Sequence, residues 1–281
     1  MEPDFDNDIP LQSPTQVAAP APTPHPTELI EEASKVSPLE WEEKYKVASA
    51  EAYQYGISLL EEDETNPELW KLWAVEEKEE ERPLRIMQRL VPSNKWSQVY
   101  RVEGIIKGRA ERYAWIFQDH DKETRMMWDT EVESVQQLET YRTTEGDIDV
   151  VKCEVKLPWM MSNRLLLGVQ SCRYTENGTH TYAYQTSDHY YFTKHFKETV
   201  HQKCYMVPNC IVFIWLCPLN NGLCSIKMIV CLEPGPLYLA APKLNYSYPW
   251  KLIDRVRLWE HVVDKWREYY PLDPKLVENR K

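Results

Sequence analysis

Residues Cys153 to Arg164 read CEVKLPWMMSNR, and this stretch is the most informative part of the chain for its fold. From Cys153 to Leu157 apolar and charged side chains alternate, which predicts a strand with one buried face. The following residues separate this strand, predicted over Ile148 to Leu157, from a further predicted strand over Arg164 to Tyr174. The stretch is therefore expected to join two consecutive strands.

A second informative string, RMMWD, lies upstream at Arg125 to Asp129. It ends a segment, residues 109 to 128, that has helical spacing of its apolar residues Tyr113, Ile116, Phe117 and Met127. Arg125 and Asp129 are four positions apart, so a helix would carry both side chains on one face.

Helix and strand signals continue over the rest of the chain. Ser37 and Pro38, with Glu40 three residues after Ser37, form a capping-box signal for a helix that runs to about Leu60. Short strand-like runs separated by polar links imply an antiparallel sheet. These runs cover Leu69 to Val75, Leu84 to Leu90, Gln98 to Ile106, Val135 to Thr143, His180 to Thr186, Tyr205 to Leu216 and Leu223 to Leu232.

A long amphipathic helix is predicted from Pro249 to Tyr270, with Leu252, Val256, Trp259, Val263, Trp266 and Tyr270 on one face. That face must lie on an apolar surface. The order of elements predicts an α+β fold in which a curved antiparallel sheet is closed by this C-terminal helix. A space between sheet and helix would be a natural apolar binding site. The periodicity alone leaves a solid core open as the alternative.

The two strings, in this order and at this separation, resemble the START lipid-transfer domain. The resemblance implies a helix-grip fold that encloses one lipid. In a phosphatidylcholine-binding member of this family, an Arg and an Asp beside a Trp meet the lipid phosphate and choline, and Arg125, Trp128 and Asp129 hold the matching positions. A guanidinium group offers forked donors to a phosphate. Without the resemblance, Arg125 and Asp129 read as an ordinary surface ion pair.

Further residues are expected at this lipid site. Arg164 ends the second motif and is either a lipid contact or a residue that serves the fold. Tyr182 and Tyr184 would share one strand face, where their hydroxyls suit a cavity wall, although core tyrosines are a common alternative. The remaining candidates are Trp215 on a strand that is apolar on both faces, and Val256, Trp259 and Val263 on the C-terminal helix.

The chain departs from the family text at three positions. Leu165 and Leu166 stand where the family has a carboxylate and an aromatic residue, and Cys153 stands where it has a Trp. Aromatic faces attract a quaternary ammonium only within about 6 Å, so a choline cage is not expected. The resemblance then favours a glycerophospholipid as cargo and transient contact with membranes. Because these family residues are replaced, a second interpretation stays open: the protein is a non-transfer adaptor that acts through protein contacts.

Composition argues against several other functions. The chain has only 8 Gly, which disfavours Gly-rich phosphate loops, and its net charge of -11 disfavours binding to nucleic acid. The seven His are scattered without the Cys or carboxylate partners of a zinc site, and no nucleophile elbow or P-loop motif occurs. We therefore expect no enzyme, no cofactor and no metal site.

The sequence also predicts the domain organisation. Residues 1–38 contain 8 of the 20 prolines and few large apolar residues, which predicts a disordered, acidic tail. The tail could be a docking segment for a Pro-recognition module, or a plain solvated tail. Residues 39–271 would form the lipid-binding domain, and 272–281 a flexible C-terminus. The absence of a signal-peptide pattern, together with an odd number of Cys, predicts a cytoplasmic protein.

Overall fold

The structure is a computed structural model that describes residues 36–76, 81–90, 98–156, 163–186, 205–206, 210–232 and 242–270. The predicted tail up to residue 35, the motif residues 158–162 and the predicted C-terminus at 272–281 lie outside the described residues.

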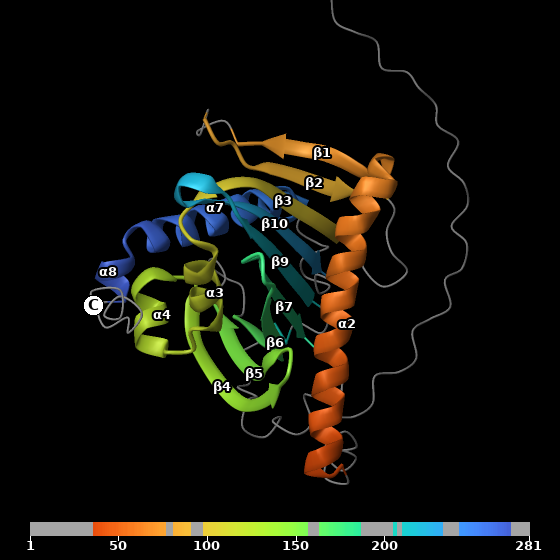
Figure 1. The fold of residues 1–281 in the computed structure, drawn as a ribbon, viewed down its shortest axis with the longest axis vertical. Coiled ribbons are helices and arrows are strands. Elements are labelled where there is room, and N and C mark those ends of the chain that lie inside the picture. The colour runs from red at the N-terminus through yellow and green to blue at the C-terminus, as the bar shows by residue number, and fades with distance from the viewer. Residues whose placement is uncertain are drawn as a thin grey trace, which may run out of the picture.

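A single curved sheet forms the centre of the fold (Figure 1). Its strands are antiparallel and follow one another in space in the order β1 (Trp70–Val75), β2 (Arg85–Arg89), β3 (Gln98–Lys107), β10 (Leu223–Leu232), β9 (Cys210–Pro218), β7 (His180–Thr186), β6 (Arg164–Tyr174), β5 (Gly146–Val155) and β4 (Val132–Thr143). A short strand, β8 (Tyr205–Met206), runs parallel to β6 off this path. Within the described residues, β1 and β4 form the two edges of the sheet.

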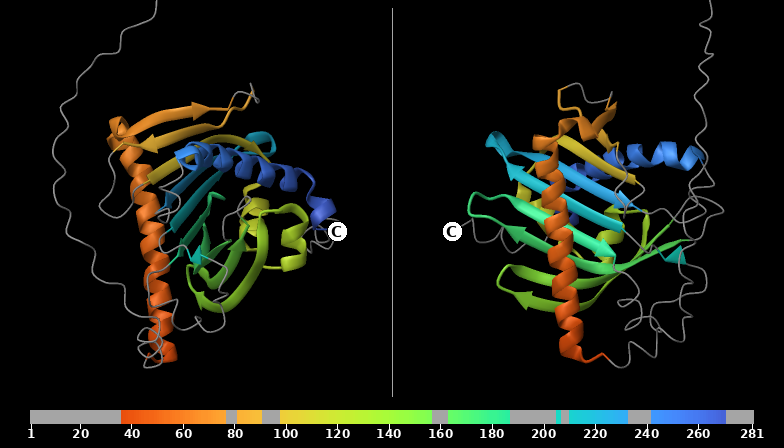
Figure 2. Two further views of the ribbon diagram at one scale, coloured as in Figure 1. Left: turned by 180° about the vertical axis from the view of Figure 1, so that it is seen from behind. Right: turned by 90° about the vertical axis from the view of Figure 1, so that its right-hand side faces the viewer.

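Helices cover both faces of this sheet. The helix α2 (Pro38–Thr65) packs on one face, across β5, β6, β7 and β9. On the other face lie α3 (Ala110–Gln118), α4 (Lys122–Trp128), α7 (Pro242–Asp264) and α8 (Trp266–Tyr269). In the right-hand view of Figure 2, α2 crosses the strands on the near side while α7 lies behind the sheet. Short 3-10 turns occur at η1 (Pro67–Leu69) and η2 (Asn220–Gly222).

The start of α2 confirms the capping-box prediction. The Ser37 hydroxyl accepts a hydrogen bond from the Glu40 amide at 3.3 Å, and the Glu40 carboxylate accepts one from the Ser37 amide at 2.7 Å. These two bonds satisfy amides that have no partner inside the helix, so the chain begins the helix here.

Two apolar clusters explain why the sheet needs helices on both faces. On the α2 face, Phe213, Ile211 and Ile229 pack against Ala52 and Leu59. On the opposite face, a larger cluster joins residues of β2, β3, β9 and β10 to α3 and α7. The strand β9 contributes to both clusters, which confirms the prediction that Ile211 to Leu216 is buried on two sides.

Three predicted elements differ from the structure. The helical stretch 109–128 is two helices, because Asp121 caps a new helix by accepting a hydrogen bond from the Thr124 amide at 2.9 Å. The predicted strand Tyr205 to Leu216 is divided into β8 and β9. The C-terminal helix begins at Pro242, not Pro249, and is interrupted at Lys265 before α8. A proline inside a helix removes one hydrogen bond, and the buried face that follows Pro249 offsets this loss.

Candidate functional site

The face of the sheet opposite α2 carries the candidate site. We call it the concave face. On it Tyr182 and Tyr184 of β7 lie opposite Cys172 and Gln170 of β6, and Asp149 of β5 lies opposite Gln170. The helix α3 packs over β7 and β9, and α4 packs over β4, so both helices cover this part of the face. Side chains of the strands β4 to β7 therefore meet the two short helices.

A chain of polar side chains runs across this concave face. The Tyr182 hydroxyl donates to Gln170 Oε1 at 3.0 Å, and Gln170 Nε2 lies 2.8 Å from His120 Nε2. His120 also lies 3.4 Å from Asp149 Oδ2, and Asp149 Oδ1 accepts hydrogen bonds at 2.8 Å from Gln137 and from Thr140.

The Asp149 carboxylate, which belongs to this row of hydrogen-bonded side chains, remains charged. Burial raises the pKa of Asp149, but hydrogen bonds from His120 and Thr140 outweigh that effect and lower it below its usual value. At its outer end the polar chain meets an open pocket of about 680 Å³. The pocket lies between α3, the link to α4 and β4, and its walls include Trp115, His120 and Gln137. Its size is within the ordinary range of small-molecule sites.

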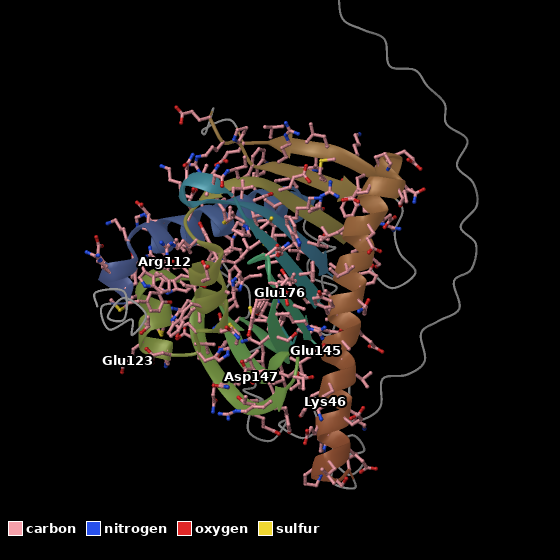
Figure 3. The ribbon with its side chains drawn as sticks, in the orientation of Figure 1. Lys46, Arg112, Glu123, Glu145, Asp147 and Glu176 are labelled. Carbon is pink, nitrogen blue, oxygen red and sulfur yellow. The ribbon has the colours of Figure 1, made fainter. Side chains whose placement is uncertain are left out.

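The predicted pair Arg125 and Asp129 lies on the inner side of α4, whereas the labelled Glu123 of the same helix points away from the fold (Figure 3). Arg125 Nε is 3.5 Å from Asp129 Oδ2, and the guanidinium lies 4.4 Å from the centre of the Trp128 ring. Arg125 Nη1 donates to the Ile116 carbonyl at 2.8 Å. The structure therefore brings Arg125, Trp128 and Asp129 together as one group.

Asp129 has a second cationic partner that the sequence did not indicate. Arg255 of α7 donates from Nη1 to Asp129 Oδ2, and from Nη2 to Glu131 at 2.5 Å. Burial lowers the pKa of Arg255, but the attraction of the Asp129 and Glu131 carboxylates outweighs it and raises that pKa. Arg255 therefore stays charged and joins the C-terminal helix to the end of α4.

Two side chains near this group, Cys153 and Tyr182, are strongly desolvated. Cys153 keeps part of its surface exposed, yet burial raises the pKa of its thiol to about 11, with Arg125 as the next largest influence. Burial likewise raises the pKa of Tyr182 well above its usual value, and Arg125 opposes the rise.

Not all predicted residues join this group. Trp215 lies on the opposite face of the sheet, where it packs with the cluster under α2. Val256, Trp259 and Val263 are buried in the largest apolar cluster, and Trp259 stacks edge-on against Phe117 at 4.7 Å. Arg164 begins β6 opposite Val155, on the same face as Tyr182. Tyr184 is also buried there, and its hydroxyl has no hydrogen-bond partner within the described residues.

Sequence patterns did not indicate His120, Gln170 and Arg255 as site residues. Gln170 follows the apolar Val169 in a predicted strand, so a polar residue at that position was the available signal for a buried contact. Arg255 is one of several charged residues in the predicted C-terminal helix, and nothing local distinguishes it from Arg257. In the part of the chain that the structure describes, no group of three His, Cys, Asp or Glu side chains could hold a metal ion. No helix in that part is long and apolar enough to cross a membrane.

No protein-family model matches this sequence, and no curated protein sequence matches it. Solved structures are similar in fold. Human STARD10 is 14% identical over 76% of this chain and 82% of its own, with a TM-score of 0.57. Human StAR-related lipid transfer protein 5 is 18% identical over 78% of this chain and 99% of its own, with a TM-score of 0.54.

A fragment of the STAR-related lipid transfer protein from Xanthomonas axonopodis is 16% identical over 67% of this chain and 99% of its own, with a TM-score of 0.50. These likenesses confirm the predicted fold. The chain has the helix-grip fold of START domains, with a curved antiparallel sheet and a long C-terminal helix.

Proposed function

We propose that this chain, which has the fold of START domains, binds one lipid molecule at its concave face and carries it between membranes. The observation that carries the proposal is the group formed by Arg125, Trp128 and Asp129, in which Arg125 Nε lies 3.5 Å from Asp129 Oδ2 and the guanidinium lies 4.4 Å from the centre of the Trp128 ring. Structures of the same fold include proteins named for lipid transfer. Contact with a membrane would be transient, during the uptake and release of the lipid.

The cargo we propose is a glycerophospholipid, with its phosphate at Arg125. Nη2 of Arg125 makes no hydrogen bond within the described residues, whereas Nη1 is held by Ile116 and the ring of Trp128 supports the guanidinium plane. A guanidinium with a spare donor and a fixed orientation suits a phosphate oxygen. Each methylene of an acyl chain contributes about 0.8 kcal/mol when it leaves water. An enclosed apolar space for the chains is therefore the main source of affinity.

The C-terminal helix α7 is the element we propose to move when lipid enters. It covers the sheet over β3, and ionic groups fasten it on two sides, through Arg255 to Asp129 and through Arg257 to Glu76. The six described cysteines are free thiols, which agrees with a reducing cytosol. We also retain the proposal that residues 1–38 dock on a protein partner.

Uptake of a fluorescent phospholipid from vesicles tests this function. Arg125→Ala should reduce uptake roughly tenfold or more, because a hydrogen bond to a charged group is worth about 1.5 to 3 kcal/mol. Arg109→Ala is the matched control, since Arg109 is exposed at the start of α3. Uptake that is equal in the wild type and Arg125→Ala, with unchanged circular dichroism, would refute the role of Arg125.

A second candidate function is an adaptor that keeps the fold and has a filled interior. The observation that favours it is the burial of Val256, Trp259 and Val263, which we expected to meet lipid, against protein side chains. An adaptor would bind no lipid after exposure to vesicles. Native mass spectrometry of the vesicle-treated protein distinguishes the two functions.

A further inference from the structure

The charge around Asp129 specifies the lipid head group more narrowly than the fold does. Asp129 is 1% exposed, and two guanidinium groups share its carboxylate. Arg255 donates directly to Oδ2, and Arg125 Nε lies 3.5 Å from the same oxygen. An isolated buried carboxylate would be strongly disfavoured, so these two partners account for its burial.

The described charges at this place leave one positive charge in excess. Glu131 and Lys251 also belong to the group, but they are 47% and 43% exposed and pair with each other at 3.3 Å. Counted together, the three cations Arg125, Arg255 and Lys251 face the two carboxylates of Asp129 and Glu131. A phosphate at Arg125 would balance the excess. A head group that also carried an ammonium would bring a further positive charge to a carboxylate that already has two cationic partners, and like charges in an enclosed site repel strongly.

Asp129 still lacks one hydrogen bond. Its Oδ1 atom is buried and accepts no bond within the described residues. A buried acceptor without a donor is costly, so a ligand group that donates there would be favoured. Because Arg125 and Arg255 already supply positive charge beside Asp129, the group that donates to Oδ1 need not be charged. A hydroxyl is the neutral donor that phospholipid head groups offer.

We infer that the cargo is a glycerophospholipid whose head group is uncharged and bears hydroxyls, as in phosphatidylglycerol and phosphatidylinositol, and that Arg255 sets this specificity. The inference rests on the proposed function. Arg255 occupies the place that a cationic head group would otherwise take beside Asp129. Its guanidinium comes from α7, so the closing helix supplies the positive charge when it lies on the sheet.

Competition between head groups provides the test. The protein is incubated with vesicles that contain equal amounts of phosphatidylglycerol, phosphatidylinositol, phosphatidylcholine and phosphatidylethanolamine with the same acyl chains, and the bound lipid is identified by mass spectrometry. The wild type should bind the two hydroxyl-bearing lipids at least about tenfold more than the two that carry an ammonium, a ratio that corresponds to one charge-assisted contact.

Three variants show whether Arg255 is responsible. Arg255→Met should lose the preference, because Asp129 then pairs with Arg125 alone and can accept an ammonium. The double variant Arg255→Met with Asp129→Asn removes one charge of each sign, so it should keep the preference for anionic lipid and avoid an unpaired buried carboxylate. Arg267→Met is the control, since Arg267 is exposed on α8.

Each outcome decides between defined alternatives. Preferential binding of phosphatidylcholine or phosphatidylethanolamine by the wild type would overturn the head-group inference and leave lipid carriage intact. So would an unchanged lipid profile in a folded Arg255→Met protein. If Arg255→Met does not fold, the double variant decides, because loss of its preference for anionic lipid would contradict the charge argument. Binding of no lipid by the wild type would overturn the proposed function and this inference together.

Discussion

Replacement of Glu260 by Gln should loosen the C-terminal helix from the sheet. Glu260 is 8% exposed on α7 and accepts three hydrogen bonds through its carboxylate. They come from Arg82 at 2.6 Å, from Arg257 at 2.5 Å and from the Lys107 amide at 2.6 Å. This carboxylate therefore joins α7 to the end of β3 and to the segment before β2.

The expected loss follows from the burial of these partners. Removing the charge of one partner in a buried ionic group costs about 3 to 5 kcal/mol, because the other charges stay buried without compensation. Arg257 keeps Glu76 as a partner, so we expect the lower end of this range, about 3 kcal/mol of unfolding free energy. For a domain of this size, the midpoint temperature of thermal unfolding should fall by roughly 6 to 12 °C.

Glu268→Gln is the matched control. Glu268 is 64% exposed on α8 and pairs with Lys265 at 3.4 Å, so its loss should cost less than about 0.5 kcal/mol. Thermal unfolding and urea unfolding of both variants measure the difference. Equal midpoints for the two variants would refute the reasoning that Glu260 fastens α7.

The pH dependence gives an independent check. Burial raises the pKa of Glu260, but the bonds from Lys107, Arg82 and Arg257 outweigh it, so the pKa is lowered in the folded protein. A lowered pKa contributes stability that is present above the unfolded value, about 4.3, and is lost as the pH falls through the folded value. The difference in stability between the wild type and Glu260→Gln should therefore shrink below about pH 4.3.

Three further predictions concern the rest of the chain. A Cβ at Gly56 of α2 would lie 2.1 Å from the Phe213 ring, so Gly56→Ala should destabilise the protein by about 1 to 3 kcal/mol, whereas Ser58→Ala at an exposed position of the same helix should not. Burial raises the pKa of Cys153 to about 11 and that of Cys172, Cys210 and Cys224 to about 12, so iodoacetamide at pH 8 should leave these thiols unmodified until the protein unfolds; rapid labelling of Cys210 in the native protein would contradict its burial. Removal of residues 1–36 should leave the thermal midpoint nearly unchanged, because the segment offers little apolar surface, and a fall of many degrees would show that the tail packs on the domain.

The positions of most strands could be predicted from the sequence because their patterns are local. Alternation and turn residues gave β6 and β7 with the bounds that the structure has, Arg164–Tyr174 and His180–Thr186. The ends of helices were harder to predict from the sequence. The three residues Asp119 to Asp121 divide the segment that was predicted as one helix, and the break depends on a side-chain cap that propensity does not reveal.

The grouping of site residues depended on contacts that are distant in sequence. Arg255 and Asp129 are 126 positions apart, and no local pattern selects Arg255 from its charged neighbours. The strand of Trp215 is apolar on both faces, so alternation could not indicate which face meets the site. Arg125 and Asp129 were found because the string RMMWD resembles the family text, and their spacing of four positions is a local property of a helix.

Native mass spectrometry of the full chain after incubation with phospholipid vesicles tests the central claim most directly. If the concave face encloses one lipid, the folded protein should appear with an added mass of one phospholipid, and Arg125→Ala should show much less of this species. A spectrum that contains only the mass of the bare chain, with every phospholipid offered, would contradict lipid carriage and favour a filled interior.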